Sequence, residues 1–277
     1  MTGFLNIDKR SGDTSAFVVN RAKRLLHTAC GHMGTLDPLA SGVLPVGVGN
    51  AARLFDYFLS KRKTYRARFR FGATTPTLDG ESEPTFGGEI PTAEAIEGAL
   101  PELTGELEQI PPLYSARCLG GKRGYQLARG GGAFELPPKK VTVYSFELLG
   151  QTAPDEFEFS IVCGGGTYIR SLSRDLASAL GTLGYTTALR RTASGVFTEE
   201  TAVPLSALTP ENVQSFVIPT DSVLPFPVLE MEDERYYRGV RFAVDLQDGV
   251  YKIYRGGAFY GLGAVEEGVL RPEKKLC

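Results

Sequence analysis

Apolar and polar residues alternate along residues 63–72, the segment KTYRARFRFG. Its apolar positions recur at every second residue: Tyr65, Ala67, Phe69 and Phe71. The positions between them carry Thr64 and three arginines. Because successive side chains of a strand point to opposite faces, this period of two predicts a half-buried strand.

Two other segments carry apolar residues at helical spacing. The first follows NIDKRSGDTS, where Thr14 or Ser15 can cap a helix, and its apolar positions are Val18, Ala22, Leu25 and Leu26. The second, TYIRSLSRDLASAL, follows the alternating segment DEFEFSIVC and a triple glycine. This order predicts a strand, a glycine turn and a helix that form one unit.

The remaining segments of the chain indicate which fold class to expect. The acidic stretch PTAEAIEGAL predicts an exposed helix, and GAFELPPKKVTVYSFEL predicts a loop that runs into a strand. The C-terminal stretch GVYKIYRGGAFYGLGAVEEGVLRP has short apolar runs divided by glycines, which predicts a small β module. Because strands and helices are mixed irregularly, we expect an α+β fold rather than a doubly wound parallel sheet.

Length and composition narrow the class of protein. A chain of 277 residues with 42% hydrophobic content has room for one large domain and a small appendage. No run approaches the roughly 18 to 20 apolar residues that cross a bilayer, and MTGFLNIDKRSG lacks an export pattern, so a cytoplasmic protein is expected. Four scattered cysteines and two histidines favour neither a disulfide framework nor a metal site.

The net charge of −2 conceals strong segregation of sign along the chain. Residues 79–108 hold nine acids and residues 197–234 hold eight, with no Lys or Arg in either block. Basic clusters lie at 61–70 and at 117–140. Such clusters are often only solvated faces, but gathered around one cleft they would bind phosphates, and the acidic blocks would then face away.

Asp37 lies among glycines and prolines in CGHMGTLDPLASGVLPVGVG. One interpretation is structural, because Asp is a favoured N-cap and Pro38 suits the first position of a helix. The other is functional. Gly42 and Pro45 would stop such a helix at once, and a carboxylate held on a glycine-rich turn is well placed for a ligand.

Arg170 falls in the first turn of a predicted helix, where the helix dipole disfavours a cation. It should therefore contact an anion. A carboxylate partner would stay ionised, as a nucleophile must, but a phosphate would serve Arg170 equally well. By residue type alone, Tyr65 and Leu189 are ordinary core residues and His32 an ordinary loop histidine.

Taken together, these segments resemble the bacterial tRNA pseudouridine-55 synthase family. The similar blocks occur in the family's order, from about residue 3 to residue 200: LNIDKRSGDTS, GHMGTLDPLASGVLPVGVGNAARL, KTYRARFRFGATTPTLDGE, IPPLYSARCLGGKRGYQLARGG, CGGGTYIRSLSRDLASALG and ALRRTASGVF. The C-terminal GGAFYGLGAVEEGVLRPEKKL resembles a short RNA-binding tail of the PUA type.

The resemblance implies a mostly antiparallel central sheet flanked by helices. It implies a catalytic domain over residues 1–228, with an RNA-clamping insert at about 111–140, and a PUA-like domain over 229–277. The activity would be isomerisation of uridine 55 in the T stem-loop of tRNA, after the base is flipped out of the RNA. No cofactor, guide RNA or obligate protein partner is expected.

The resemblance also implies roles for individual residues. Asp37 would be the nucleophile, Arg170 its partner and Tyr65 the residue stacked on the uracil. Tyr168 and Leu189 would help to form the uridine pocket, and His32 would fill the space that the flipped base leaves. Whether Asp37 adds to the sugar C1′ or promotes elimination is left open.

An RNA clamp is expected from the glycine-rich basic segment RCLGGKRGYQLARGGG, by contacts of Arg117, Lys122, Arg123 and Arg129 with phosphates. Two positions depart from the family pattern. Arg10 follows Lys9 where the family usually has proline, and Cys118 stands where the family usually has lysine. The first bears on a loop conformation and the second on one RNA contact.

Three other functions fit parts of the same pattern. A non-catalytic tRNA-binding or tRNA-folding protein would use the same basic surfaces without turnover. A glycoside hydrolase would need a second carboxylate, for which Asp79 and Glu81 are nearest in sequence. A guide-RNA-dependent relative is the third, and the long insert at 111–140 favours the stand-alone type instead.

Overall fold

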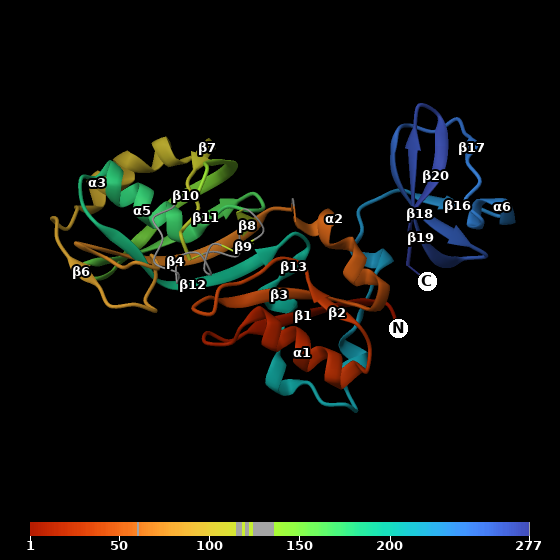
Figure 1. Ribbon diagram of the computed structural model, residues 1–277, viewed down its shortest axis with the longest axis horizontal. Coiled ribbons are helices and arrows are strands. Elements are labelled where there is room, and N and C mark those ends of the chain that lie inside the picture. Colours follow the sequence, from red (N-terminus) through yellow and green to blue (C-terminus); the bar gives the residue numbers. More distant parts are fainter. Residues whose placement is uncertain (60, 115–117, 120–121, 124–135, 277) are drawn as a thin grey trace.

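The protein consists of a broad, twisted sheet covered by helices and a smaller β module at its C-terminal end (Figure 1). This computed structural model describes residues 1–59, 61–114, 118–119, 122–123 and 136–276. The main path of the large sheet runs in the order β14 (Val203–Pro204), β1 (Gly3–Lys9), β3 (Ser41–Val48), β12 (Gly184–Ser194), β4 (Lys63–Phe71), β11 (Glu156–Cys163), β10 (Lys139–Ala153) and β7 (Gly105–Gln109).

Most neighbours in this sheet are antiparallel, and the pairs β1–β14 and β3–β12 are parallel. The mixed α+β fold with a mostly antiparallel sheet is therefore confirmed. Shorter strands are β2 (Cys30–His32), β5 (Ala73–Thr74), β6 (Thr85–Phe86), β8 (Cys118–Leu119), β9 (Lys122–Arg123), β13 (Phe197–Thr198) and β15 (Ile218–Pro219).

The described helices are α1 (Ser15–Leu26), α2 (Phe55–Leu59), α3 (Ala93–Ala99), α5 (Ile169–Ala179) and α6 (Glu234–Tyr237). Short 3₁₀ helices are η1 (Gly49–Leu54), η2 (Leu100–Leu103), η3 (Glu199–Thr201), η4 (Leu205–Ala207), η5 (Val213–Phe216) and η6 (Asp221–Val223). Thr14 caps α1, accepting a hydrogen bond from the backbone N–H of Phe17 at 3.0 Å. The unit of strand β11, glycine turn and helix α5 is as the sequence predicts.

Alternation along β4 decides which face of the sheet is covered. Phe69 and Phe71 are fully buried, and the Phe69 ring lies 4.8 Å from that of Phe159 on β11. The buried sides of α1, α3 and α5 join these residues in one apolar core. Burial of this surface at about 25 cal/mol per Å² is the main force that holds the helices on the sheet.

The C-terminal module is a second sheet in the order β16 (Val228–Glu230), β18 (Gly249–Arg255), β19 (Ala258–Glu266), β20 (Val269–Lys275) and β17 (Phe242–Ala243). Tyr254 donates a hydrogen bond to Asp221 Oδ2 at 2.6 Å, and Arg53 donates to the Lys275 carbonyl at 3.1 Å. These contacts join the module to η6 and to η1.

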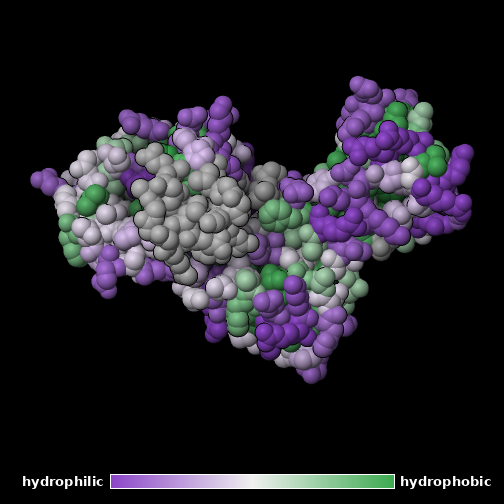
Figure 2. All heavy atoms as spheres, viewed as in Figure 1, coloured by the Kyte–Doolittle hydropathy of each residue, from purple (hydrophilic) through white to green (hydrophobic). Residues whose placement is uncertain are grey.

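On the face shown in Figure 2, hydrophilic residues cover much of the C-terminal module and the exposed side of α1. The exposed positions of α1 include Arg21, Lys23 and Arg24. Among the described residues, no helix is long and apolar enough to cross a membrane.

Candidate active site

Asp37 lies in an irregular loop that connects β2 to β3, and no helix follows it. The backbone N–H of Ala40 donates to the Asp37 carbonyl at 3.1 Å, which closes a single turn before the chain enters β3. The interpretation of Asp37 as a helix cap is therefore wrong. Its side chain is free to face outward and is one third exposed.

The loop that carries Asp37 is held by the N-terminal segment between β1 and α1. Ser15 Oγ donates to the Leu36 carbonyl and accepts from the Leu36 N–H, both at 2.9 Å. The N–H of Gly12 and the ammonium of Lys9 donate to the Pro38 carbonyl at 2.8 and 3.3 Å. Because Lys9 is fully buried, its pKa is lowered to about 8. Both neighbours of Asp37 are thus fixed, and the carboxylate is fixed with them.

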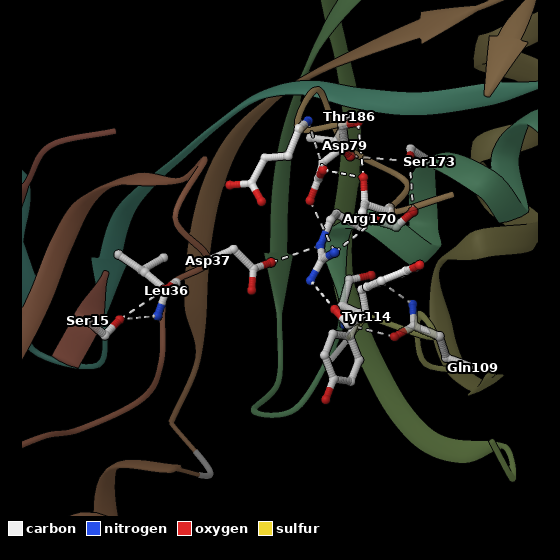
Figure 3. Close-up of polar contacts among 12 residues, drawn as sticks. Ser15, Leu36, Asp37, Asp79, Gln109, Tyr114, Arg170, Ser173 and Thr186 are labelled. Atoms are coloured by element: carbon white, nitrogen blue, oxygen red, sulfur yellow. Dashed lines mark hydrogen bonds and ion pairs between the residues drawn. The ribbon is translucent and has the colours of Figure 1, made fainter. Parts of the chain in front are cut away.

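Arg170 lies between two carboxylates (Figure 3). Its Nε is 2.9 Å from Asp37 Oδ2, and its Nη1 is 3.1 Å from Asp79 Oδ2. The remaining donors reach the carbonyls of Thr77 and Tyr114 at 2.8 and 3.1 Å. The expected contact between Arg170 and Asp37 is present, and the planar fork of the guanidinium fixes the orientation of the carboxylate.

Asp79 is the second carboxylate partner of Arg170, a role that the sequence analysis did not predict. Its side chain is 4% exposed, and its Oδ1 accepts hydrogen bonds from Thr77 Oγ1 at 2.6 Å and from the Glu81 N–H at 3.1 Å. The expectation that the whole acidic block 79–108 faces away from the basic surfaces is therefore wrong at Asp79. A residue this buried cannot face a sugar, so it is not the second carboxylate of a glycosidase.

The start of helix α5 is fixed by strand β7. Gln109 donates its amide to the Tyr168 carbonyl at 3.1 Å and accepts from the Tyr168 N–H at 2.8 Å. Ser171 Oγ donates to the Ile110 carbonyl at 2.8 Å. The Gln109 bonds satisfy the backbone groups of Tyr168, where the helix begins without a side-chain cap, and together with the Ser171 bond they position Arg170.

A cavity of about 220 Å³ opens beside Asp37. It is smaller than the roughly 300 Å³ at which drug-sized pockets begin, and so suits one nucleoside. It is lined by Gly34, Thr35, Leu36, Asp37, Phe55, Lys63, Tyr65, Gly164, Gly166, Thr167, Tyr168, Ile169, Leu189 and Arg191. The structure thus brings Asp37, Tyr65, Tyr168 and Leu189 together, with Arg170 behind Asp37. His32, at the end of β2, is not among the lining residues.

The deep wall of the cavity is cationic. Burial raises the pKa of Tyr65 to about 12, against the opposing effect of the nearby Arg191 charge. Burial and the same charge lower the pKa of Lys63 to about 8. The Lys63 ammonium donates to the carbonyls of Lys61 and Phe58 at 2.6 and 3.1 Å. At neutral pH Tyr65 is therefore a neutral phenol.

Arg191 and Lys63 were not expected at the site, and Asp79 was expected there only as the second carboxylate of a glycoside hydrolase. For the first two, the signal was strand alternation: Arg191 lies two residues after Leu189 on β12, and Lys63 two residues before Tyr65 on β4. Residues two apart on a strand share a face, so each cation shares the face of an expected pocket residue. Asp79 carried no comparable local signal, because its partner is far away in the sequence.

Of the four expected RNA-clamping residues, the structure describes only Lys122 and Arg123. Arg117 and Arg129 lie outside the described residues. Lys122 and Arg123 form strand β9, paired with β8, and the description there covers the backbone alone.

Among the described residues, no group of three or more His, Cys, Asp or Glu side chains is arranged to hold a metal ion.

Gly42→Ala is expected to lower the free energy of unfolding by about 2 kcal/mol or more. Gly42 follows the Asp37 loop with φ of +96°, and a Cβ there would overlap the carbonyl oxygen of Arg191, its neighbour on β12. Gly239→Ala is a matched control, because φ is +92° and nothing lies within 4 Å of the added carbon. Urea unfolding of both variants measures the difference, and equal losses would contradict the close packing of β3 on β12.

Known proteins resemble this chain over most of its length. Residues 23–169 match the family model described as TruB family pseudouridylate synthase (N terminal domain). The chain is 40% identical over 247 residues to the tRNA pseudouridine synthase B of Caulobacter vibrioides, which covers 86% of this chain and 79% of that protein. It is 39% identical over 287 residues to the tRNA pseudouridine synthase B of Aquifex aeolicus, with 100% of both chains covered.

A solved structure shares the fold. The crystal structure of a Cbf5-Nop10-Gar1 complex contains a chain that superposes with a TM-score of 0.72 at 25% sequence identity. The superposition covers 99% of this chain and 85% of that chain. Both the large sheet and the C-terminal β module therefore have counterparts there.

Proposed function

This chain belongs to the TruB family of pseudouridylate synthases, and from that membership we propose that it converts uridine 55, in the T arm of tRNA, to pseudouridine. It is an enzyme that isomerises uridine to pseudouridine in tRNA. The position in the T arm and the roles of individual residues are the proposal.

The observation that carries the proposal is the placement of Asp37. A partly exposed carboxylate stands at the rim of a nucleoside-sized cavity, and a buried arginine fixes its orientation. Its loop is anchored at Leu36 and Pro38, so that little reorganisation is needed when the substrate arrives. Such an arrangement suits attack on, or proton removal from, a sugar held in the cavity.

The reaction needs no redox step. The bond between N1 and C1′ breaks, the ring rotates, C5 bonds to C1′, and the C5 proton leaves. In one route Asp37 adds to C1′, and in the other it removes a proton from C2′. Either route requires the uridine to leave its stack in the RNA, at a cost of a few kcal/mol.

Contacts inside the cavity offset this cost. The ring of Tyr65 forms part of the wall and would stack on the uracil, a contact worth about 1 to 3 kcal/mol. Leu189 and Tyr168 line the same cavity and would confine the base and the ribose. In this proposal His32 acts outside the cavity, in the space that the flipped base leaves.

Tritium release tests this function directly. A tRNA transcript labelled with tritium at C5 of uridine loses one label for each pseudouridine formed, because the C5 proton leaves in the last step. We expect release that approaches one equivalent per transcript with the wild-type protein. Binding of the transcript without release would instead support a tRNA-folding protein.

The organisation of the chain is also part of the proposal. Residues 1–228 would form the catalytic domain, with the insert at about 111–140 as an RNA clamp, and residues 229–277 would form a PUA-like RNA-binding domain. The separate five-stranded sheet that begins at β16 supports this division. The solved relative occurs in a complex with Nop10 and Gar1, whereas we propose that this protein acts without a guide RNA or obligate partner, in the cytoplasm.

Replacing Lys122 and Arg123 with Ala together is expected to weaken tRNA binding and flatten its salt dependence. Each lost phosphate contact removes about 0.9 from the slope of log affinity against log salt for B-form DNA and about 0.7 for single strands, and a change of similar size is expected for the tRNA. Arg117 and Arg129 would contribute in the same way. Binding measured across a salt series decides the point, since an unchanged slope would mean that this cluster is only a solvated face.

A further inference from the structure

Arg191 is a fully buried cation in the wall of the cavity. It is 1% exposed, and among the described residues no carboxylate lies within ion-pair distance of its guanidinium. Two other arginines nearby do have carboxylate partners. Arg170, in the same site, is paired with Asp37 and Asp79. Arg190, the preceding residue on the opposite face of β12, is paired with Asp8 and Glu199.

Backbone carbonyls hold the Arg191 guanidinium in place. Its Nε donates to the Val43 carbonyl at 2.7 Å, and its two Nη atoms donate to the carbonyls of Gly34 and Thr35 at 3.2 and 3.5 Å. On β4, the residue directly opposite is Tyr65. The cation is thus fixed between the loop that carries Asp37 and the aromatic wall of the cavity.

A buried charge without a counter-ion is expensive. Carbonyl dipoles offset only part of the desolvation cost, which is several kcal/mol for an ion inside a protein. Packing alone does not require a positive charge here. The position therefore suits an anion that appears in the cavity only during the reaction.

The reaction produces such an anion. When the N1–C1′ bond breaks, its electron pair stays on the uracil, whose negative charge spreads over N1, O2 and O4. In the addition route, Asp37 loses its charge by forming a bond to C1′. In the elimination route, it loses its charge by taking the C2′ proton. In both, one unit of negative charge moves from Asp37 to the base.

We propose that Arg191 stabilises the uracil anion formed when the N1–C1′ bond breaks, an inference that rests on the proposed function. Arg170 stabilises the charge on Asp37 before bond cleavage, and Arg191 stabilises the same charge after it has moved to the base. Interactions that strengthen only as charge develops accelerate the chemical step.

The field of Arg191 already acts on the groups around the cavity. Its charge lowers the pKa of Lys63 and of His32, in each case after the larger effect of burial. It also opposes the burial that raises the pKa of Tyr65. Each effect has the sign expected of a nearby cation.

Single-turnover rates with two bases test the proposal. Arg191→Gln removes the charge, and the target position of a bare tRNA transcript carries either uridine or 5-fluorouridine. Because fluorine withdraws electrons, the 5-fluorouracil anion needs less help from the protein. Nuclease digestion and mass spectrometry follow the loss of the starting nucleoside, which reports cleavage of N1–C1′ for both bases.

We expect Arg191→Gln to lower the rate with uridine about 10²- to 10³-fold, as for the loss of an oxyanion-hole donor. The fold-loss of rate with 5-fluorouridine should be at least about tenfold smaller than the fold-loss with uridine. The affinity of the variant for tRNA should change little. Arg190→Gln is the matched control, because it removes an arginine from the same strand on the face away from the cavity. It should lower both rates by the same small factor.

Equal losses for the two bases, or a rate within about threefold of wild type with uridine, would overturn the proposal. If Arg191→Gln does not fold, Arg191→Lys is tested in its place. Because lysine retains the positive charge, the uridine rate of this variant should stay within about tenfold of wild type. A loss of 10²-fold or more, equal for both bases, would count against a role for the charge. A wild-type protein that converts neither base would refute the proposed function instead.

Discussion

Asp37→Asn is expected to reduce the single-turnover rate on the order of 10⁴-fold or more, and to leave tRNA affinity nearly unchanged. The amide keeps the shape of the side chain and still accepts a hydrogen bond from Arg170 Nε, which the structure places 2.9 Å from Asp37 Oδ2. It can neither add to C1′ nor take a proton from C2′. Tritium release measures the rate, and filter binding measures the affinity.

The folded state should tolerate this change. Asp37 is one third exposed, and Arg170 keeps Asp79 as a partner in the variant. A thermal unfolding midpoint close to that of the wild type is therefore the control. Turnover within tenfold of the wild-type rate would show that Asp37 is not the reacting carboxylate.

Arg170→Met should damage both stability and activity. The side chains of Arg170 and Asp79 are 5% and 4% exposed, so removal of the cation leaves an uncompensated buried carboxylate, at a cost of about 3 to 5 kcal/mol. The variant also loses the group that orients Asp37. Urea unfolding and tritium release measure the two losses, and we expect a rate at least about 10²-fold below that of the wild type.

A double variant separates the two effects. In Arg170→Met with Asp79→Asn, the buried negative charge is gone as well, so much of the lost stability should return. The rate should stay low, because Asp37 still has no arginine beside it. Recovery of activity along with stability would show that Arg170 acts only through the fold.

Local structure was predictable because each element carries its own pattern. The alternation from Tyr65 to Phe71 identifies a strand with one covered face, and β4 is that strand. Thr14 and the apolar spacing behind it identify α1 and its cap. Such signals depend only on residues that are neighbours in the sequence, and so they can be recognised without knowledge of the tertiary structure.

The chemistry of Asp37 could not be predicted in the same way. Its residue type fits a helix cap as well as a nucleophile, and what decides between them is an arginine 133 residues away together with a loop anchored by Ser15 and Gly12. The resemblance to a known family supplied the pairing with Arg170. It did not supply Asp79, which closes the other side of the guanidinium.

Charged residues in the deep wall were missed for a physical reason. Lys63 and Arg191 follow strand alternation onto the covered face, yet charged side chains are normally assigned to solvent because their burial is costly. Sequence reasoning therefore overlooks cations at buried positions. Lys63 and Arg191 are two such cations, and both line the cavity in which the uridine would react.

Mapping pseudouridine in an unmodified tRNA transcript, after incubation with this protein alone, tests the central claim most directly. Mass spectrometry of nuclease fragments locates the modified base, with Asp37→Asn as the matched control. We predict stoichiometric pseudouridine at position 55 in the T arm with the wild-type protein and none with the variant. No pseudouridine with the wild type, conversion at other uridines only, or equal conversion by Asp37→Asn would contradict the account.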